Sequence, residues 1–373
     1  MAEFFSRIIA AILAFFAAIT AFFGYTPKTE EPEIKNVIVM IGDGMGENHL
    51  EKTKQERQTE LVMDTLPVKG YATTYCANKP VTDSAAAATA LACGVKTKKG
   101  MVGWYWFEQE GAEWAENTHP MNITELCMEN GMKTGIVTTD YTSGATPSGF
   151  SVHTESRDNT EDILAQQLAS GIDLIWGRDN EDLTASQVEE AGYTYISTIE
   201  DMNALTGNEK SYGLFTSSLY HVENSDENTP TLAEMTASAI ELLDTDNENG
   251  FFLMVEGAHI DKKAANQNDD GTTEAVWSFD NAVKEAIEFT QADGHTLLIV
   301  TADHETGGIT LDENGDYVFT TSSHTDTNVP VMVLGPYSFI EQGEVIDNTD
   351  IPVRIAKALG FDTDSFPRSE ENK

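Results

Sequence analysis

Two side chains that commonly bind metal ions follow an apolar run near the end of the chain. The run covers residues 296–300 (TLLIV), and Asp303 and His304 come directly after it. Ligands of an open α/β sheet collect at the carboxyl ends of its strands. A carboxylate and an imidazole at such a place are positioned to hold a divalent cation.

Two further apolar runs end in the same kind of residue. Residues 36–41 lead to Asp43, and residues 251–255 lead to Glu256 and then to Asp261. Carboxylate oxygens and imidazole nitrogens delivered by separate strand ends are typical of a divalent-metal cluster. The sequence therefore predicts that these strand ends meet.

A serine at the start of an alanine-rich run is the candidate nucleophile. Asp83 and Ser84 precede a run that should be helical and that ends near Gly94. One interpretation makes Asp83 or Ser84 only a helix N-cap. Beside a metal cluster a second interpretation is open, because the helix N-terminus favours a phosphate and a bound zinc lowers the pKa of a serine hydroxyl.

Two further side chains could contact a phosphate or a cation. Thr146 offers a hydroxyl suited to magnesium, and the fork of Arg157 could bind two phosphate oxygens, although an isolated arginine is more often a surface salt-bridge residue. His153 we expect to be structural. The remaining histidines without carboxylates at ligand spacing should be surface or core residues: His49, His119, His221 and His295.

The composition restricts the class of protein. A chain of 373 residues with 40% hydrophobic content can bury a large core, which favours one large domain. The 62 acidic residues against 22 basic ones give a formal net charge of −40, which argues against a nucleic-acid partner. An anionic substrate would need a local positive site.

The amino terminus differs from the rest of the chain. Residues 8–25 carry no charge, which predicts a signal peptide or a membrane anchor, with an ordinary buried helix as the alternative. We expect residues 1–34 to be this leader plus a tether, residues 35–373 to be the catalytic domain, and the protein to be exported. Three cysteines exclude a disulfide-stapled scaffold.

The body of the chain alternates strand-like and helix-like segments. Helical periodicity covers residues 231–243 and 274–289. Continuous apolar strands separated by helices indicate an α/β fold with a large, mostly parallel central sheet and helices on both faces. The expected strands are residues 37–41, 134–138, 174–177, 193–197, 251–255, 297–300 and 329–334.

Taken in order, these motifs resemble the alkaline phosphatase family over residues 35 to about 360. The matching segments are 43–46 (DGMG), 82–86 (TDSAA), 145–147 (ATP), Arg157, 255–257 (VEG), 260–262 (IDK), 301–305 (TADHE) and 324–325 (HT). The resemblance implies an alkaline-phosphatase-like fold and a hydrolase of small phosphate monoesters. It also implies a phosphoserine intermediate, up to two Zn²⁺ ions, one Mg²⁺ ion and a homodimer.

The resemblance implies a role for each matching residue. Ser84 would be the nucleophile and Arg157 the phosphate clamp, with Lys262 adding positive charge near the phosphate. The zinc that activates Ser84, and to which Ser84 also binds, would be held by Asp43, Asp303 and His304. Magnesium would lie between Asp43, Thr146 and Glu256. The second zinc would be held by Asp261 and His324.

The chain departs from the family at two positions. Ala265 stands where the family has a third zinc ligand, a histidine, four residues after the aspartate at 261. Water, Asn266 or Asp269 could complete that site. Gly144 stands where the family commonly has an aspartate or histidine near the magnesium. Residues 104–114 are a candidate lid or subunit contact.

Two alternatives to a phosphomonoesterase stay open. Ala265 allows a degenerate, non-catalytic phosphate-binding protein of the same fold. A phosphodiesterase or sulfatase relative is the other, but Ser84 is followed by Ala85 and Ala86 and lacks the context of a sulfatase nucleophile.

Overall fold

The structure is a computed structural model, and it describes residues 33–106, 119–179, 181–363 and 366. The predicted leader and its apolar run at 8–25 lie outside these residues, as does most of the candidate lid at 104–114. Among the residues that are described, no helix has the length and apolar character needed to cross a membrane. The compact unit that begins at Glu33 contains the central sheet and the candidate site residues.

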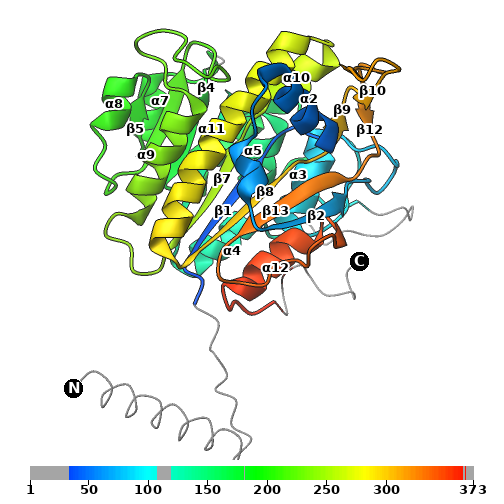
Figure 1. Ribbon diagram of the computed structural model, residues 1–373. Coiled ribbons are helices and arrows are strands. Elements are labelled where there is room, and N and C mark those ends of the chain that lie inside the picture. Colours follow the sequence, from blue (N-terminus) through cyan, green and yellow to red (C-terminus); the bar gives the residue numbers. More distant parts are fainter. Residues whose placement is uncertain (1–32, 107–118, 180, 364–365, 367–373) are drawn as a thin grey trace, which may run out of the picture. The chain divides into compact units, whose positions relative to one another are not determined.

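A ten-stranded sheet forms the centre of this unit (Figure 1), with the strand order β14-β2-β13-β8-β1-β7-β3-β4-β6-β5. Only β13 runs antiparallel to its neighbours; the other pairs are parallel. The strands are β1 Asn36–Ile41, β2 Val68–Thr73, β3 Lys133–Tyr141, β4 Leu174–Arg178, β5 Thr194–Ile196, β6 Ser211–Phe215, β7 Phe251–Glu256, β8 Thr296–Thr301, β13 Val329–Leu334 and β14 Val345–Asp347.

The register of the three central strands brings their carboxyl ends to one level. Ile41 at the end of β1 pairs with Glu256 of β7 on one side and with Thr301 of β8 on the other. All six residues of each of these strands are buried, which explains their continuous apolar sequences. The loops that carry the candidate ligands therefore start side by side.

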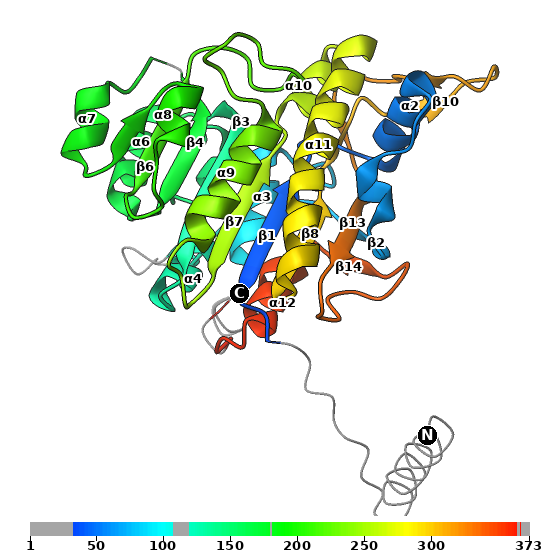
Figure 2. The ribbon, with the colours of Figure 1, turned by 60° about the vertical axis from the view of Figure 1, so that its left-hand side comes forward.

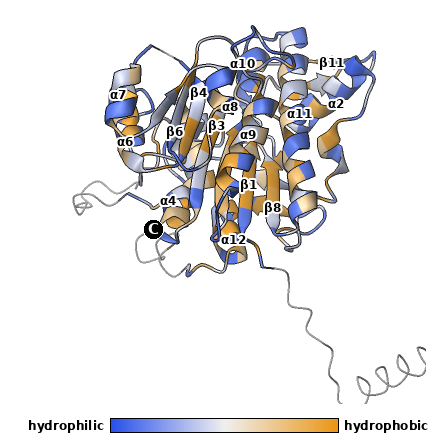
Figure 3. Ribbon diagram, turned by 90° about the vertical axis from the view of Figure 1, so that its left-hand side faces the viewer, coloured by the Kyte–Doolittle hydropathy of each residue, from blue (hydrophilic) through white to orange (hydrophobic). Residues whose placement is uncertain are grey.

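Helices cover both faces of the sheet. The helices α9 Leu232–Asp244 and α11 Asp269–Asp293 lie against one face, and α3 Ser84–Cys93, α4 Ile123–Glu129 and α12 Asp350–Ala358 lie against the other (Figures 1 and 2). Apolar residues line β1 and β8, whereas α11 carries both polar and apolar positions (Figure 3), as a helix with one solvent-facing side requires.

The remaining helices are short or peripheral, and two small two-stranded sheets, β10-β11 and β12-β9, lie outside the central sheet. The helices are α2 Glu47–Arg57, η1 Val62–Thr65, α5 Ala145–Gly149, α6 Thr160–Ser170, α7 Ala185–Glu190, α8 Ile199–Asn203 and α10 His259–Ala265. The short strands are β9 Glu305–Thr306, β10 Thr310–Leu311, β11 Tyr317–Val318 and β12 His324–Thr325. The antiparallel pairing of β9 with β12 places His324 opposite Thr306.

The predicted fold class is confirmed, and the seven expected strands all form within a few residues of their predicted bounds. Three strands of the sheet were not predicted: β2, β6 and β14. Their sequences, VKGYAT, SYGLF and VID, are short, interrupted by glycine or polar residues, and β2 and β14 are only partly buried. A periodicity argument cannot separate such segments from loops.

Candidate active site

The first cluster of candidate ligands lies directly beyond β1 and β8. His304 Nε2 is 3.1 Å from Asp303 Oδ2 and 3.5 Å from Asp43 Oδ1. The other oxygen of Asp303 accepts hydrogen bonds from the backbone N–H groups of Gly44 and His304, at 3.0 Å and 2.9 Å. All three side chains are buried, and together they could hold a metal ion.

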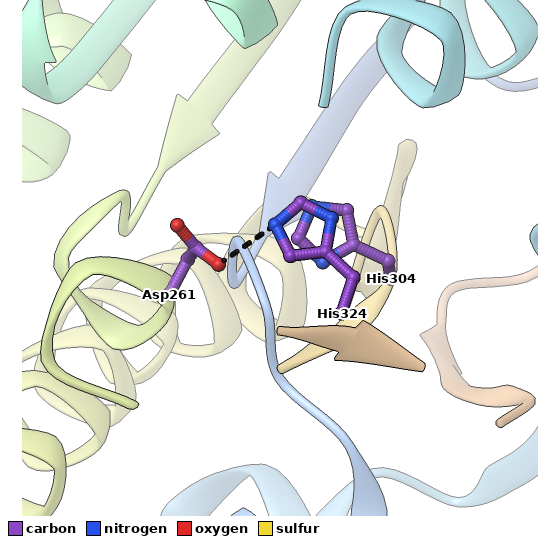
Figure 4. Close-up of side chains that lie close together, drawn as sticks. All are labelled: Asp261, His304 and His324. Atoms are coloured by element: carbon purple, nitrogen blue, oxygen red, sulfur yellow. Dashed lines mark ion pairs between the residues drawn. The ribbon is translucent and has the colours of Figure 1, made fainter. Parts of the chain in front are cut away.

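The second cluster shares His304 with the first. Asp261, His304 and His324 could also hold an ion (Figure 4), and His324 Nε2 is 3.3 Å from Asp261 Oδ1. His324 Nδ1 lies 3.0 Å from the carbonyl oxygen of Thr82, so that nitrogen carries the proton. A backbone partner of this kind fixes the imidazole with Nε2 toward the cluster, as in many metal-binding histidines.

A close backbone contact holds the two clusters together. The backbone N–H of Asp261 donates to the carbonyl of Asp43 at 2.7 Å. Gly44 has a φ of +81°, and a Cβ added to it would lie 2.8 Å from the Cα of Asp261. A larger residue at position 44 would therefore separate the loop after β1 from the first turn of α10.

Ser84 begins α3 beside the first cluster. Its Oγ lies 3.2 Å from His304 Nε2, and the side chain is buried. Asp83 rather than Ser84 is the N-cap, because the Asp83 carboxylate accepts a hydrogen bond from the backbone N–H of Ala86. The Ser84 hydroxyl is therefore left free to face the cluster, at the positive end of a ten-residue helix.

Asp83 connects Arg157 to the helix that begins with Ser84. From the sequence, Asp83 is expected only to cap this helix. Nη1 of Arg157 lies 3.4 Å from Asp83 Oδ2, which also accepts from the backbone N–H of Gly100. The side chain of Arg157 is 38% exposed, so its remaining donors can reach a ligand. The same carboxylate caps the helix that begins with Ser84 and pairs with the arginine.

A third group of polar side chains lies at the ends of β3 and β7. The Glu256 carboxylate accepts a hydrogen bond from the Thr138 hydroxyl. The hydroxyl of Thr146, on α5, is buried and has no hydrogen-bond partner among the described residues. The side chain of Lys262 pairs with Asp140, a residue that the sequence analysis did not single out. The position of Asp140 near the site cannot be predicted unless β3 and β7 are known to be neighbours.

Burial shifts the pKa values of three candidate ligands. Burial, with the charge of Asp303 as the next cause, raises the pKa of Asp43 well above its usual range. Burial and then the nearby charge of Asp140 raise the pKa of Glu256 to about 7. Burial lowers the pKa of His304, against the opposing effect of Asp303. A divalent cation bound between these groups would oppose the raised carboxyl pKa values, because it stabilises the charged form.

The donor set fits divalent cations. Three buried oxygen atoms in this site have no hydrogen-bond partner among the described residues: Asp43 Oδ1, Asp303 Oδ2 and Thr146 Oγ1. An unsatisfied buried oxygen is costly unless an ion or water completes it. Carboxylate and imidazole ligands suit Zn²⁺, and an all-oxygen set of Asp43, Thr146 and Glu256 suits Mg²⁺.

Near Ala265, the two side chains suggested by the sequence as replacement ligands, Asn266 and Asp269, each make another contact in the structure. The side-chain amide of Asn266 donates to the carbonyl of Lys262 at 2.7 Å. Asp269 forms an ion pair with Lys52 at 3.0 Å. Independently of these contacts, Asp261 and His324 form a group with His304 as its third member.

The other histidines agree with the structural roles expected of them. His153 contacts the carbonyl of Gly103 through Nδ1 at 2.8 Å and the carboxylate of Glu125 through Nε2 at 2.9 Å. Its ring stacks on that of His119, and both line a cavity of about 740 Å³ whose walls contain none of the predicted site residues. His49 is fully buried, and burial lowers its pKa to about 3.

The chain is similar to known proteins over most of its length. Residues 34–177 and 176–355 match the sequence profile of the family described as alkaline phosphatase. Alkaline phosphatase 4 of Bacillus subtilis is 35% identical over 78% of this chain and 65% of its own length, and the Escherichia coli enzyme is 29% identical over 88% and 86%. The chain thus spans about 65% of the length of the Bacillus relatives.

A solved structure shares the fold. The alkaline phosphatase of the Antarctic bacterium TAB5 is 28% identical, with a TM-score of 0.74 over 89% of this chain and 100% of that one. A variant of that enzyme has been solved with magnesium bound in a site called M3. From the sequence profile, which covers most of its length, the chain belongs to the alkaline phosphatase family.

Proposed function

We propose that this protein hydrolyses phosphate monoesters through a phosphoserine formed on Ser84. One observation carries the proposal: Ser84 Oγ lies 3.2 Å from the single imidazole, His304, that belongs to both candidate metal clusters. A nucleophile next to two cation sites suits an in-line displacement at phosphorus, because two cations can stabilise both the attacking and the leaving oxygen. Asp43, Asp303 and His304 would hold the first Zn²⁺, Asp261 and His324 the second, and Asp43, Thr146 and Glu256 the Mg²⁺.

The side chains divide the work of the reaction. Arg157 binds two oxygens of the phosphate and turns the phosphorus toward Ser84. Oγ of Ser84 then forms a bond to phosphorus while the bond to the ester oxygen breaks, and the alcohol leaves. A water molecule attacks the phosphoserine in the second step, which releases phosphate and restores the serine. When bound, the cations lower the pKa of the Ser84 hydroxyl and stabilise negative charge on the leaving oxygen.

Charge supports the choice of an anionic substrate. The side chains of Arg157 and Lys262 are 38% and 40% exposed, and they flank the buried clusters. With two or three divalent cations they would make a local positive site on a chain of net charge −40. Lys262 also pairs with Asp140, so part of its charge is already compensated.

A second candidate function is favoured by Ala265. With two protein ligands of its own, Asp261 and His324, the second zinc site would bind its ion weakly. A protein that binds phosphate without turning esters over would then result. Hydrolysis of p-nitrophenyl phosphate across pH, with metal analysis of the same sample, separates the two. Turnover with near two zinc ions per chain supports the enzyme, and no turnover at any added zinc concentration contradicts it.

The wider context of the protein is also a proposal. We propose that residues 1–34 are a leader that exports the catalytic domain at 35–373, and that the domain forms a homodimer. A relative in Bombyx mori is named a membrane-bound alkaline phosphatase and is 29% identical over 86% of this chain. Fractionation of cells that produce the full chain, followed by measurement of the mass of the purified protein in solution, tests both statements.

A further inference from the structure

Asp140 connects two parts of the site. It is the residue before the last of β3, and its carboxylate forms an ion pair with the ammonium group of Lys262. Lys262 directly follows Asp261 on α10. Asp140 therefore helps to position the ammonium group of Lys262 next to the second cluster.

The same residue is tied to the group at Glu256. The backbone N–H of Asp140 donates to Thr138 Oγ1 at 2.9 Å, and the Thr138 hydroxyl donates its own proton to Glu256. Thr138 has one proton to give, so the direction of both bonds is fixed. A displacement of Asp140 would be transmitted to Glu256 through this one hydroxyl.

Gly144 leaves the space in which the Asp140 carboxylate lies. A Cβ at position 144 would be 3.1 Å from Asp140 Oδ2 and 3.0 Å from the carbonyl oxygen of Tyr141. The φ of Gly144 is −55°, a value that any residue adopts. Backbone strain therefore does not explain this glycine, whereas the neighbouring carboxylate does. Position 144 is also the N-cap of α5, the helix that carries Thr146.

We propose that Asp140 is a positioning residue for the cation held by Glu256 and Thr146. One carboxylate oxygen holds Lys262, and the other, next to the start of α5, orients a water molecule on that cation. Outer partners of this kind change metal affinity without binding the ion themselves. The proposal rests on the proposed function for the assignment of Mg²⁺ to this corner.

Magnesium binding to the zinc-loaded protein, measured by calorimetry without substrate, tests the proposal. Asp140→Asn keeps the shape of the side chain and removes its charge, and we expect it to weaken Mg²⁺ binding by about tenfold or more. Asp270→Asn, which removes an exposed acid from the first turn of α11, is the matched control and should leave Mg²⁺ binding unchanged. Equal Mg²⁺ affinities for wild type and Asp140→Asn overturn the proposal.

A relocated carboxylate gives the sharper test. In Asp140→Gly combined with Gly144→Asp, the carboxylate returns to the same space from the other side. We expect Mg²⁺ affinity to recover to within about threefold of wild type. A folded double variant that binds Mg²⁺ as weakly as Asp140→Asn overturns the proposal, because then β3 itself and not the carboxylate matters.

Lys262→Met carries the test if Asp140→Asn does not fold. Without its lysine, the Asp140 carboxylate turns wholly to the cation, so Mg²⁺ affinity should rise about threefold or more. An unchanged affinity overturns the proposal. Turnover of p-nitrophenyl phosphate by the wild type is recorded separately. Absence of turnover with the expected change in Mg²⁺ binding refutes the proposed function alone, and turnover with unchanged Mg²⁺ binding refutes only the role of Asp140.

Discussion

The imidazole rings of His304 and His324 stack on each other, with their centroids 3.5 Å apart and their planes inclined by 21°. His304 is completely buried, whereas His324 is partly exposed. The second cluster therefore has a more exposed ligand than the first. Because the two rings are in contact, a change at His324 would be felt directly at His304.

The first prediction concerns the nucleophile. Ser84→Ala removes the hydroxyl but leaves the other proposed metal ligands and Arg157, so it should lose most of the turnover, about 10³-fold or more, and still bind metal and phosphate. Turnover, metal content and phosphate affinity are measured on one preparation. Ser170→Ala, at the end of α6, is the control. Labelled phosphate trapped at acid pH on any residue other than Ser84 would contradict the assignment.

The second prediction concerns the missing zinc ligand. Ala265 closes the last turn of α10, one turn after Asp261, and is partly exposed, so a histidine can be placed there. Ala265→His should raise zinc affinity about tenfold or more and reduce the dependence of turnover on added zinc. Titration of activity against free zinc measures this, with the exposed Ala191→His as the control. Identical zinc curves for wild type and Ala265→His would show that the site is already complete.

The third prediction concerns the phosphate clamp. Arg157→Lys replaces a planar two-point donor by a point charge, so KM and the inhibition constant for inorganic phosphate should rise together, by about tenfold, with zinc content unchanged. Steady-state kinetics with and without phosphate check this. Arg354→Lys is the matched control, because Arg354 binds Glu344 at 2.7 Å and lies outside the site. A phosphate inhibition constant that does not change would remove Arg157 from the site.

The fourth prediction concerns the pH dependence of the metal-free protein. Burial raises the pKa of Glu256 to about 7, from a usual value of 4.5. A raised carboxyl pKa means that the folded state binds more protons, so stability falls as pH rises from about 4.5 through 7. The loss for Glu256 should reach about 3 kcal/mol.

Glu256→Gln isolates this contribution from that of the histidines, which changes in the opposite direction below pH 6.5. Unfolding by urea in the presence of a chelator is measured for both proteins between pH 5 and pH 8. As pH rises, the unfolding free energy of the variant should increase relative to that of the wild type. Parallel pH profiles of the two proteins would contradict the prediction. With saturating Mg²⁺ in place of the chelator, the wild type should no longer lose stability as pH rises.

Much of the site could be predicted because its residues follow buried strands. Asp43, Glu256 and Asp303 come one or two residues after, or at the end of, runs such as NVIVMI and TLLIVT whose burial is complete. Continuous apolar runs identify such strands, and parallel strands bring their ends together. The contact of Ser84 with His304 follows from the same rule only once the motif itself is recognised.

Other features depend on pairings that leave no local signal. Asp140 reaches Lys262 because β3 lies beside β7, a neighbourhood set by crossover connections and not by the residues themselves. From the sequence, Asp83 is an ordinary candidate for a helix N-cap. Its ion pair with Arg157 depends on the packing of the segment around residue 157 against it, which the sequence does not reveal. The partly polar strand β2 forms because β13 offers it an edge, and β14 then pairs with β2.

Because Ile41 pairs with both Glu256 and Thr301, metal removal should affect the unfolding of the ends of three strands together. Ions bound beyond these strands would join segments of the chain more than two hundred residues apart, as a set of removable cross-links. Such links bind the folded state and not the unfolded chain, so they add to its stability by mass action. Chelation should then loosen the upper rim of β1, β7 and β8 first, and amide hydrogens in the turns at 42–46, 257–261 and 302–306 should exchange before those in the strands below them.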